Sequence, residues 1–346
     1  MAVPTIRMVA ELAGVSTATV SRTLSRPETV RPDTRERVLG AIKETGFVPN
    51  KQAVDFRRQA TRTIILLVRD ISNPFYLDIY KGVEEFAFDA GYKVLMGDAR
   101  NDDARICHYT EMVRNRQADG LILMTGRLPK AATIAPLPPI VVALEMLEDI
   151  VLPMVAIDNR AAAARAVQHL IALGHHRIAH VTGPMEELMN RHRHDGYLAA
   201  LRDAGLPSDP ALTVQGNYRL DSGRRAIRQL LGNRATFTAV FASNDEMAVG
   251  VINELRAHGY RVPQDVSVVG FDDIVFADAA DPPLTTIRQA RREIGSRAMA
   301  MMIGILNGQQ PEDNEILIDV ELVVRGTTAR APARATQAQS AEGHTS

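Results

Sequence analysis

Apolar residues in the first 49 positions recur at the spacing of short helices. Helices are expected to follow Thr5, Ser16 and Asp33, because these side-chain oxygens can accept hydrogen bonds from the free amides of a first turn. Gly14 and Gly46 are expected to end the first and the third helix. The apolar positions are enough for one small three-helix core, made of Ile6, Val9, Ala10, Ala13, Val20, Leu24, Val38, Leu39 and Ile42.

From residue 63 to about 330, short apolar runs alternate with helical stretches. The strand-like runs are Ile64–Val68, Lys93–Met96, Gly120–Met124, Ile140–Ala143, Arg177–Thr182, Thr238–Ala242 and Val266–Gly270. The helical stretches are Phe75–Ala90, Arg105–Arg116, Arg160–Leu173, Arg191–Ala204, Asp221–Leu231 and Asp245–His258. Apolar runs separated by helices predict doubly wound parallel sheets that are covered on both sides. The runs are too many for one such sheet, so two α/β lobes are expected, with Arg291–Leu306 and Ile316–Val324 crossing back between them.

This pattern predicts four regions. Residues 1–49 form a small all-α head, and residues 63–330 form the two-lobed core. Between them, residues 50–62 are polar and basic, as in a linker or in a helix that forms only when something binds it. Residues 331–346 are small and polar, as in a disordered tail. The expected lobe boundaries are about 63–157 with 290–317 and about 158–289 with 318–330.

The charge of the chain is unevenly distributed. The formal net charge of the 346 residues is -1, but residues 1–62 hold 11 Lys or Arg against 6 Asp or Glu. The rest of the chain holds 29 against 35, so a basic head is joined to an acidic body. Such an asymmetry favours a polyanionic partner for the head.

Several classes of protein are excluded or disfavoured. Cys107 is the single cysteine, so neither an intrachain disulfide nor a cysteine-based zinc site is expected. No apolar run is long enough for a membrane span. Pro4, Arg7 and Glu11 interrupt the start of the chain, which lacks the apolar segment of a signal peptide, so a cytoplasmic protein is expected. Dinucleotide-binding, phosphate-binding and nucleophile-elbow motifs are missing, so neither an enzyme, a cofactor nor a metal site is expected.

Residues 5–24, TIRMVAELAGVSTATVSRTL, have the spacing of a helix-turn-helix, whose second helix enters the major groove of DNA. On that second helix, Arg22 can read a guanine edge, and Thr17 and Ala18 can contact thymine methyl groups. Ser16, Thr19 and Ser21 can hold phosphates. A plain helical hairpin with a solvated charged face is the alternative on this pattern alone. Thr5 is a further candidate DNA contact in the head.

The head and the core together resemble the LacI/GalR family of bacterial transcription regulators. In the head the resemblance lies in AELAGVSTATVSRTL and VRPDTRERVLGAIKETGFVPN. In the core it lies in SNPFY at 72–76, AGYKVLMGDA at 90–99, ADGLILM at 118–124, IDN at 157–159, LGHHRIAHVTGP at 173–184, ASNDEMAVG at 242–250, VPQDVSVVGFDD at 262–273, PPLTTIRQ at 282–289 and RGTT at 325–328. The order and spacing of these motifs cover about residues 5–328.

The resemblance implies a homodimer that places two heads on a pseudo-palindromic double-stranded operator. In the family, a hinge helix with Ala-Arg-x-Leu also wedges its Leu into the minor groove. This chain has Ala53-Val54-Asp55-Phe56 there, so Phe56 takes the wedge position, while Val54 and Asp55 depart from the pattern. The hinge residues expected to contact DNA are Asn50, Ala53 and Phe56.

The resemblance also implies a periplasmic-binding-protein-like core that binds a small effector between its lobes. The matching positions are Phe75, Tyr76, Asp158, Arg193, Tyr218, Asn244 and Asp272. Their carboxylates, amide and guanidinium suit hydroxyl and carbonyl groups, and their aromatic rings offer flat faces for a sugar or a base.

Several stretches look most like a cytidine-type nucleoside repressor of this family, so a nucleoside is the expected effector and a pentose, hexose or sugar acid the alternative. The predicted function is therefore a sequence-specific transcriptional regulator, expected to be a repressor, whose operator affinity an effector controls. Two other classes are weighed against it: a solute-binding sensor without operator-specific repression, and an enzyme that turns over the bound ligand. The tail after Arg330 has no Leu for a tetramerising heptad, which favours a dimer.

Overall fold

The computed structural model describes residues 4–47, 60–148, 150–311 and 313–332. The chain divides into two compact units: the first is the helical head up to Arg62, with which Arg116–Ala118 are grouped, and the second is the core, which holds the remaining residues from Thr63 onward. The predicted hinge contacts Asn50, Ala53 and Phe56 lie outside the described residues. Most of the expected tail lies outside as well, but the Ala331 amide still donates to Leu173 O (2.9 Å), so the ordered core reaches past the expected boundary.

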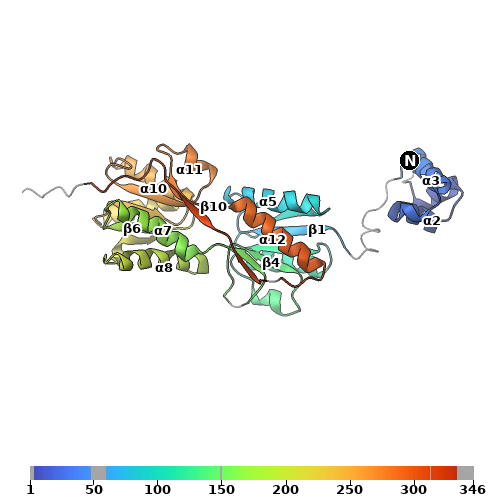
Figure 1. Ribbon diagram of the computed structural model, residues 1–346, viewed down its shortest axis with the longest axis horizontal. Helices are drawn as coiled ribbons and strands as arrows, with labels where there is room; N and C mark the ends of the chain where they lie inside the picture. The colour runs from blue at the N-terminus through green and yellow to red at the C-terminus, as the bar shows by residue number, and fades with distance from the viewer. Residues whose placement is uncertain (1–3, 48–59, 149, 312, 333–346) are drawn as a thin grey trace, which may run out of the picture. The chain divides into compact units, whose positions relative to one another are not determined.

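The head contains α1 (Ile6–Ala13), α2 (Thr17–Ser25), the short 3-10 turn Pro27–Thr29 and α3 (Pro32–Thr45) (Figure 1). Thr5 and Ser16 cap α1 and α2 as predicted, since their side chains accept from the amides of Met8 and Thr19. Gly14 ends α1 with a φ of 64°, a conformation that costs glycine little. Helices α1 and α2 and the turn between them therefore form the helix-turn-helix expected from the sequence.

Two details of the head differ from the sequence-based expectation. Helix α3 begins at Pro32, not after Asp33, because proline at the first helical position needs no amide partner and already has a helical φ. Leu39 is half exposed and lies outside the head core, whereas Ala41 is buried in it. The buried residues are Val9, Ala10, Ala13, Val20, Val38 and Ala41, with Ile6, Leu24 and Ile42 packed against them.

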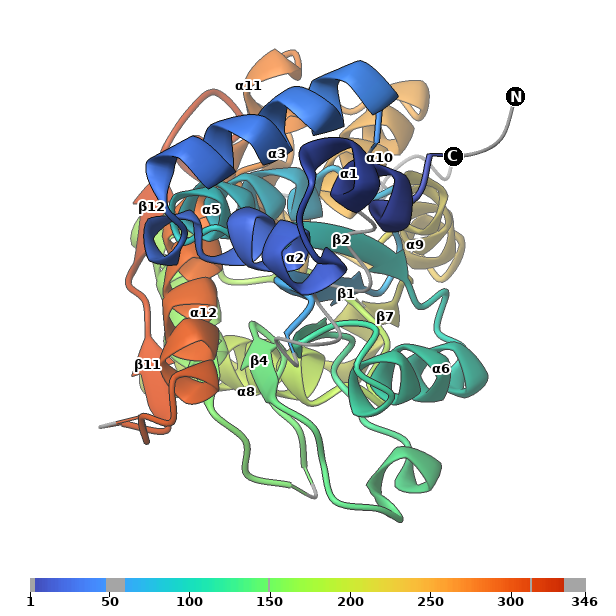
Figure 2. The same cartoon turned by 90° about the vertical axis from the view of Figure 1, so that its right-hand side faces the viewer.

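The first lobe of the core is built on a fully parallel sheet in the order β11-β5-β4-β3-β1-β2. Its strands are β1 (Thr63–Val68), β2 (Lys93–Asp98), β3 (Gly120–Met124), β4 (Ile140–Ala143), β5 (Met154–Ala156) and β11 (Glu315–Leu317). Helices α5 (Phe75–Asp89) and α12 (Arg291–Leu306) pack on each other and on one face, and α6 (Asp103–Arg114) covers the other (Figure 2). β1 and β3 are buried along their whole length, as their apolar runs predict.

The second lobe has the same plan, with the order β12-β10-β9-β8-β6-β7 and one antiparallel edge strand, β12. Its strands are β6 (Ile178–Thr182), β7 (Thr213–Gln215), β8 (Ala239–Ala242), β9 (Ser267–Asp272), β10 (Thr285–Gln289) and β12 (Val320–Val323). Helices α7 (Asn159–Ala172) and α8 (Leu188–Asp203) pack together on one side, and α9 (Leu220–Gly232) and α10 (Asp245–Ala257) on the other (Figure 1). The short helix α11 (Val275–Ala279) follows β9.

The chain crosses between the lobes three times: from β5 to α7, from β10 to α12 and from β11 to β12. The apolar run Ile316–Val324 accordingly splits into two strands that belong to different sheets. In both sheets the order reverses beside the first strand of the lobe, β1 or β6. In open parallel sheets, the strand ends at such a reversal are where ligands bind.

Candidate functional site

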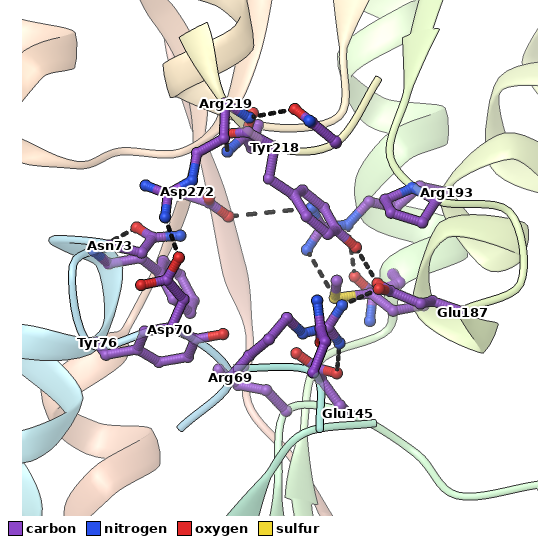
Figure 3. Close-up of a pocket in the computed structure, with 18 of the residues that line it drawn as sticks. Arg69, Asp70, Asn73, Tyr76, Glu145, Glu187, Arg193, Tyr218, Arg219 and Asp272 are labelled. Atoms are coloured by element: carbon purple, nitrogen blue, oxygen red, sulfur yellow. Dashed lines mark hydrogen bonds and ion pairs between the residues drawn. The ribbon is translucent and has the colours of Figure 1, made fainter. Parts of the chain in front are cut away.

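A cavity of about 270 Å³ lies between the lobes of the core. Segments that follow β1, β2 and β4 line it from the first lobe. From the second lobe it is lined by segments that follow β6, β7 and β8 and by the last residues of β9 and β10. Figure 3 shows their polar side chains converging on one space. The lining residues used below are Arg69, Asp70, Phe75, Tyr76, Glu145, Asn159, Glu187, Arg193, Tyr218, Arg219, Asn244, Asp272 and Gln289.

Six of the seven predicted effector contacts line this cavity: Phe75, Tyr76, Arg193, Tyr218, Asn244 and Asp272. Asp158 does not. Its carboxylate accepts from the Ala161 amide (2.9 Å) and caps α7, which is a common use of aspartate before a helix. The next residue, Asn159, lines the cavity instead and holds Arg193.

Arg193 is fixed at the base of the cavity by the second lobe alone. Its Nε donates to Asn159 Oδ1 (2.8 Å) and its Nη1 to Ser243 O (2.5 Å), while the guanidinium carbon lies 3.7 Å from the centre of the Phe271 ring. Gly196, one turn later, lets α8 approach the backbone of α7, since a Cβ there would meet Arg160 O at 2.2 Å. The guanidinium is thus held in one orientation before any ligand binds.

Asp272 lies opposite Arg193, at 4.0 Å between Oδ1 and Nη1, and accepts from Gln289 Nε2 at 2.7 Å. Burial raises the pKa of Asp272 to about 6, against the lowering effect of Arg193 and Arg291. The neighbouring Asp245 is fully buried, and burial together with Asp272 raises its pKa as well. The cavity therefore contains a carboxylate that changes its charge close to neutral pH.

Arg69, directly after β1, connects the two lobes through carboxylates on both sides. Its guanidinium pairs with Glu145 of the first lobe and with Glu187 of the second (Figure 3). Burial alone would lower the pKa of Arg69, but Glu145 and the nearby Tyr218 and Tyr76 raise it overall, so the side chain stays charged. Glu187 also accepts from the Tyr218 hydroxyl and from Asn190 Nδ2.

The segment that follows β7 reaches toward the first lobe. Tyr218 has a φ of 68°, unusual for a non-glycine residue, and its carbonyl accepts from Asn244 Nδ2 (3.0 Å). The next residue, Arg219, pairs with Asp70 and donates to Ser72 Oγ (2.9 Å), both in the first lobe. Arg69 and Asp70, adjacent in sequence, thus bind opposite charges of the second lobe.

The pair between Arg219 and Asp70 should contribute little to stability because both side chains are about 40% exposed (41% and 38%). We expect Arg219→Gln and Asp70→Asn each to lower the free energy of unfolding by about 0.2–1 kcal/mol. The double variant should lose no more than either single variant, since both remove the same interaction. Urea unfolding of the wild type, the two single variants and the double variant measures these free energies. Additive losses would show that the two residues are not coupled. In 1 M salt the stability difference between the wild type and the variants should disappear.

In the head, Thr17, Ala18 and Arg22 are exposed on α2, opposite the buried Val20. Residues 18 and 22 are one turn apart and share one side of the helix. Ser16 caps this helix, and its hydroxyl also lies 3.0 Å from that of Thr19. The structure thus presents the predicted reading residues on one accessible face, with Ser21 partly buried beside them.

The structure adds site residues that the sequence reasoning missed. Arg69 and Asp70 come directly after the predicted run Ile64–Val68, and Glu145 comes two residues after Ile140–Ala143. Charged residues directly after buried parallel strands were therefore a usable signal. Gln289 carried no comparable signal, because it ends β10, a strand that was not predicted. Glu187 carried none because it lies five residues after the predicted run Arg177–Thr182.

Fold and site together define a regulator in which a DNA-binding head is joined to a ligand-binding core. Residues 5–50 match the family described as "Bacterial regulatory proteins, lacI family", and residues 167–328 match the "Periplasmic binding protein-like domain". The chain is 40% identical to the HTH-type transcriptional repressor CytR of Escherichia coli (strain K12) over 95% of its own length and 97% of the relative's. It is 34% identical to catabolite control protein A of Priestia megaterium, with 94% and 99% covered.

Solved structures agree with these relatives. The Lac repressor dimer bound to operator and the anti-inducer ONPF has a TM-score of 0.83 at 27% identity, covering 94% of this chain and 99% of that one. A complex of the transcriptional regulator CelR with cellobiose has a TM-score of 0.72 at 33% identity, with the same coverage. The protein belongs to the LacI family and is a DNA-binding transcriptional regulator.

Neither a membrane-spanning helix nor a cluster of metal ligands occurs in the described part of the chain. None of its helices is long and apolar enough to span a membrane. No group of three or more potential metal ligands occurs within it.

Proposed function

We propose that this protein is a repressor whose operator affinity is set by a small molecule bound between the lobes of its core. The observation that carries the proposal is the cavity at the strand ends of both lobes, with Arg193 held rigidly at its base. Its volume of about 270 Å³ suits a nucleoside or a simple sugar better than a long oligosaccharide. Ligand-dependent closure of the lobes would shift the population of DNA-binding states.

Two copies would present their α2 helices to the half-sites of a pseudo-palindromic operator, as two-fold symmetry requires. Arg22, Thr17 and Ala18 would read base edges, while Thr5, Ser16, Thr19 and Ser21 would hold phosphates. Asn50, Ala53 and Phe56 remain hinge contacts expected from sequence. We further propose that the protein acts in the cytoplasm, where its DNA lies, and that the bound effector leaves chemically unchanged.

A nucleoside is the first effector candidate for two reasons. CytR, described as a transcriptional repressor, is 40% identical to this chain, and several sequence stretches of this chain resemble a cytidine-type nucleoside repressor. A pentose, hexose or sugar acid is the second. A panel of both classes should be screened by thermal shift, because a ligand that binds the folded state raises its apparent stability. Each hit is then tested for its effect on operator binding. If no ligand of either class binds, the proposed effector site is contradicted. If the protein binds random DNA as tightly as any selected sequence, a sensor without an operator is favoured.

Effector binding should weaken in acid if an effector hydroxyl donates to ionised Asp272. With the pKa of Asp272 at about 6, lowering the pH from about 7.5 to about 5 should reduce the affinity about tenfold. The raised pKa has the opposite effect on the free energy of unfolding. The folded state takes up this proton more readily than the unfolded state, so it gains stability as the pH falls through about 6. Protonation of Asp272 therefore cannot weaken effector binding in this pH range by unfolding the protein.

Calorimetric titration of the panel hit at several pH values measures this effect. Asp272→Asn should bind more weakly but with a flat profile. An unchanged acid limb in Asp272→Asn would assign the pH dependence to another group.

A further inference from the structure

We propose that the Arg69 cluster, formed by Arg69, Glu145 and Glu187, makes the cavity select uncharged ligands rich in hydrogen-bond donors and reject anionic ones. The proposal rests on the effector site described above and specifies the chemical class it takes. It would exclude phosphorylated sugars, nucleotides and sugar acids. Its basis is the charge and the hydrogen bonding of the side chains that line the cavity.

The charge balance of the cavity disfavours an anionic ligand. Three guanidinium groups and four carboxylates line the cavity. Arg193 faces Asp272, and Arg219 binds Asp70 and also lies 4.0 Å from Glu246, which is outside the lining. Arg69 is shared by Glu145 and Glu187, so one buried carboxylate is left without a cation of its own. A bound anion would add to this uncompensated negative charge in a poorly solvated space.

The guanidinium groups of the cavity are already occupied by partners within the protein. A ligand phosphate or carboxylate could reach the Nη atoms of Arg69 by displacing Glu145 or Glu187, and would leave the displaced carboxylate without its cation. Displacing Glu187 would also disturb its bonds with Tyr218 and Asn190. Arg193 has two donors committed to Asn159 and Ser243. Anion binding would therefore sacrifice existing charge-assisted bonds.

Unpaired polar atoms of the residues around the cavity also bear on the class of ligand. Arg69 Nε and Gln289 Oε1 are buried without a partner in the described structure, and both residues line the cavity. Arg69 and Gln289 are 7% and 3% exposed. An unpaired buried atom is costly, so a ligand that offers an acceptor to Arg69 and a donor to Gln289 would be favoured once these side chains turn toward the cavity.

Glu145 is the side chain best suited to sense the charge of the ligand. Arg69 is its one hydrogen-bond donor among the described residues, which leaves it free to accept from a hydroxyl or N–H group of the ligand. Gly126 keeps the space beside it open, since a Cβ at residue 126 would lie 2.3 Å from Glu145 Oε2. Replacing Glu145 by glutamine removes the negative charge and preserves the shape.

The test uses matched pairs of neutral and anionic ligands with the full-length protein. Cytidine, adenosine, ribose and glucose are compared with cytidine and adenosine 5′-monophosphate, ribose 5-phosphate and gluconate by calorimetric titration. Each neutral binder should bind at least about tenfold more tightly than its anionic partner, as expected for a like charge within about 10 Å at an effective dielectric of about 20. In Glu145→Gln this ratio should shrink about tenfold, and Glu187→Gln should shift it in the same direction.

Glu111→Gln is the matched control, since Glu111 is exposed on α6, pairs with Arg114 and does not line the cavity. It should leave the ratio unchanged. An anionic partner that binds as tightly as its neutral counterpart, or a ratio that neither Glu145→Gln nor Glu187→Gln alters, would overturn the proposal while leaving the effector site intact. If no member of any pair binds, the effector site itself is wrong, and this selectivity falls with it.

Discussion

Replacing Arg22 with alanine should weaken binding to the specific operator by roughly 5- to 150-fold, the equivalent of about 1–3 kcal/mol for one bidentate contact with a guanine. Arg22 is exposed on α2 one turn after Ala18, and the described structure gives it no ion pair that would hold it away from DNA. Its removal deletes a base contact together with a positive charge. Affinity for random DNA should fall much less, so the variant loses specificity as well as strength.

The measurement is fluorescence anisotropy with a selected operator and with random duplex at several salt concentrations. Arg37→Ala is the matched control, because Arg37 is equally exposed on α3 and its loss removes the same charge from the head. We expect Arg37→Ala to affect operator and random DNA alike. An equal loss for both DNAs in Arg22→Ala would assign Arg22 to a phosphate and leave base reading to other residues.

Replacing Arg193 with methionine should abolish the effector response and destabilise the core by about 3 kcal/mol, within the range for breaking a buried ion pair. The change would leave Asp272 without its facing cation and would remove the donors to Asn159 and Ser243. Arg193 is 3% exposed, so the groups that it contacts lie away from bulk water. For a domain of this size, the melting temperature should fall by roughly 6–12 °C.

Two further variants separate the causes of these effects. Arg193→Met combined with Asp272→Asn should recover part of the stability, because the stranded charge is gone, but not the effector response. Arg228→Met is the matched control: Arg228 pairs with Glu254 at 2.7 Å but is 59% exposed, so its loss should be small and effector binding intact. An effector response that survives in Arg193→Met would remove Arg193 from the binding site.

Sequence patterns predicted the strands whose residues are apolar throughout and failed where buried strands are polar or short. β1 and β3 are apolar and were found, whereas β10 reads Thr-Thr-Ile-Arg-Gln and was missed. Its polar side chains are buried because distant partners satisfy them: Thr286 donates to Asp245 (2.5 Å) and Gln289 to Asp272. Such long-range partners cannot be seen in a local pattern. β5 and β7, with three residues each, are too short to show a period.

The site was predicted unevenly for a related reason. Family motifs located Arg193, Asn244 and Asp272, and all three line the cavity. The same motifs placed Asp158 there, although its carboxylate is used to cap α7. Arg69 and Glu187 form their pair across 118 positions of sequence, so the pairing depends on how the lobes meet rather than on a motif.

The three crossings between the lobes also determine how this protein can be taken apart and recombined. Because β11 and β12 return the end of the chain through both halves, neither half can be excised or exchanged with a single cut. The three helices of the head, by contrast, all lie within one stretch of the chain, from Ile6 to Thr45. A hybrid joined between residues 62 and 63 would therefore combine the DNA specificity of one regulator with the effector specificity of another through a single junction.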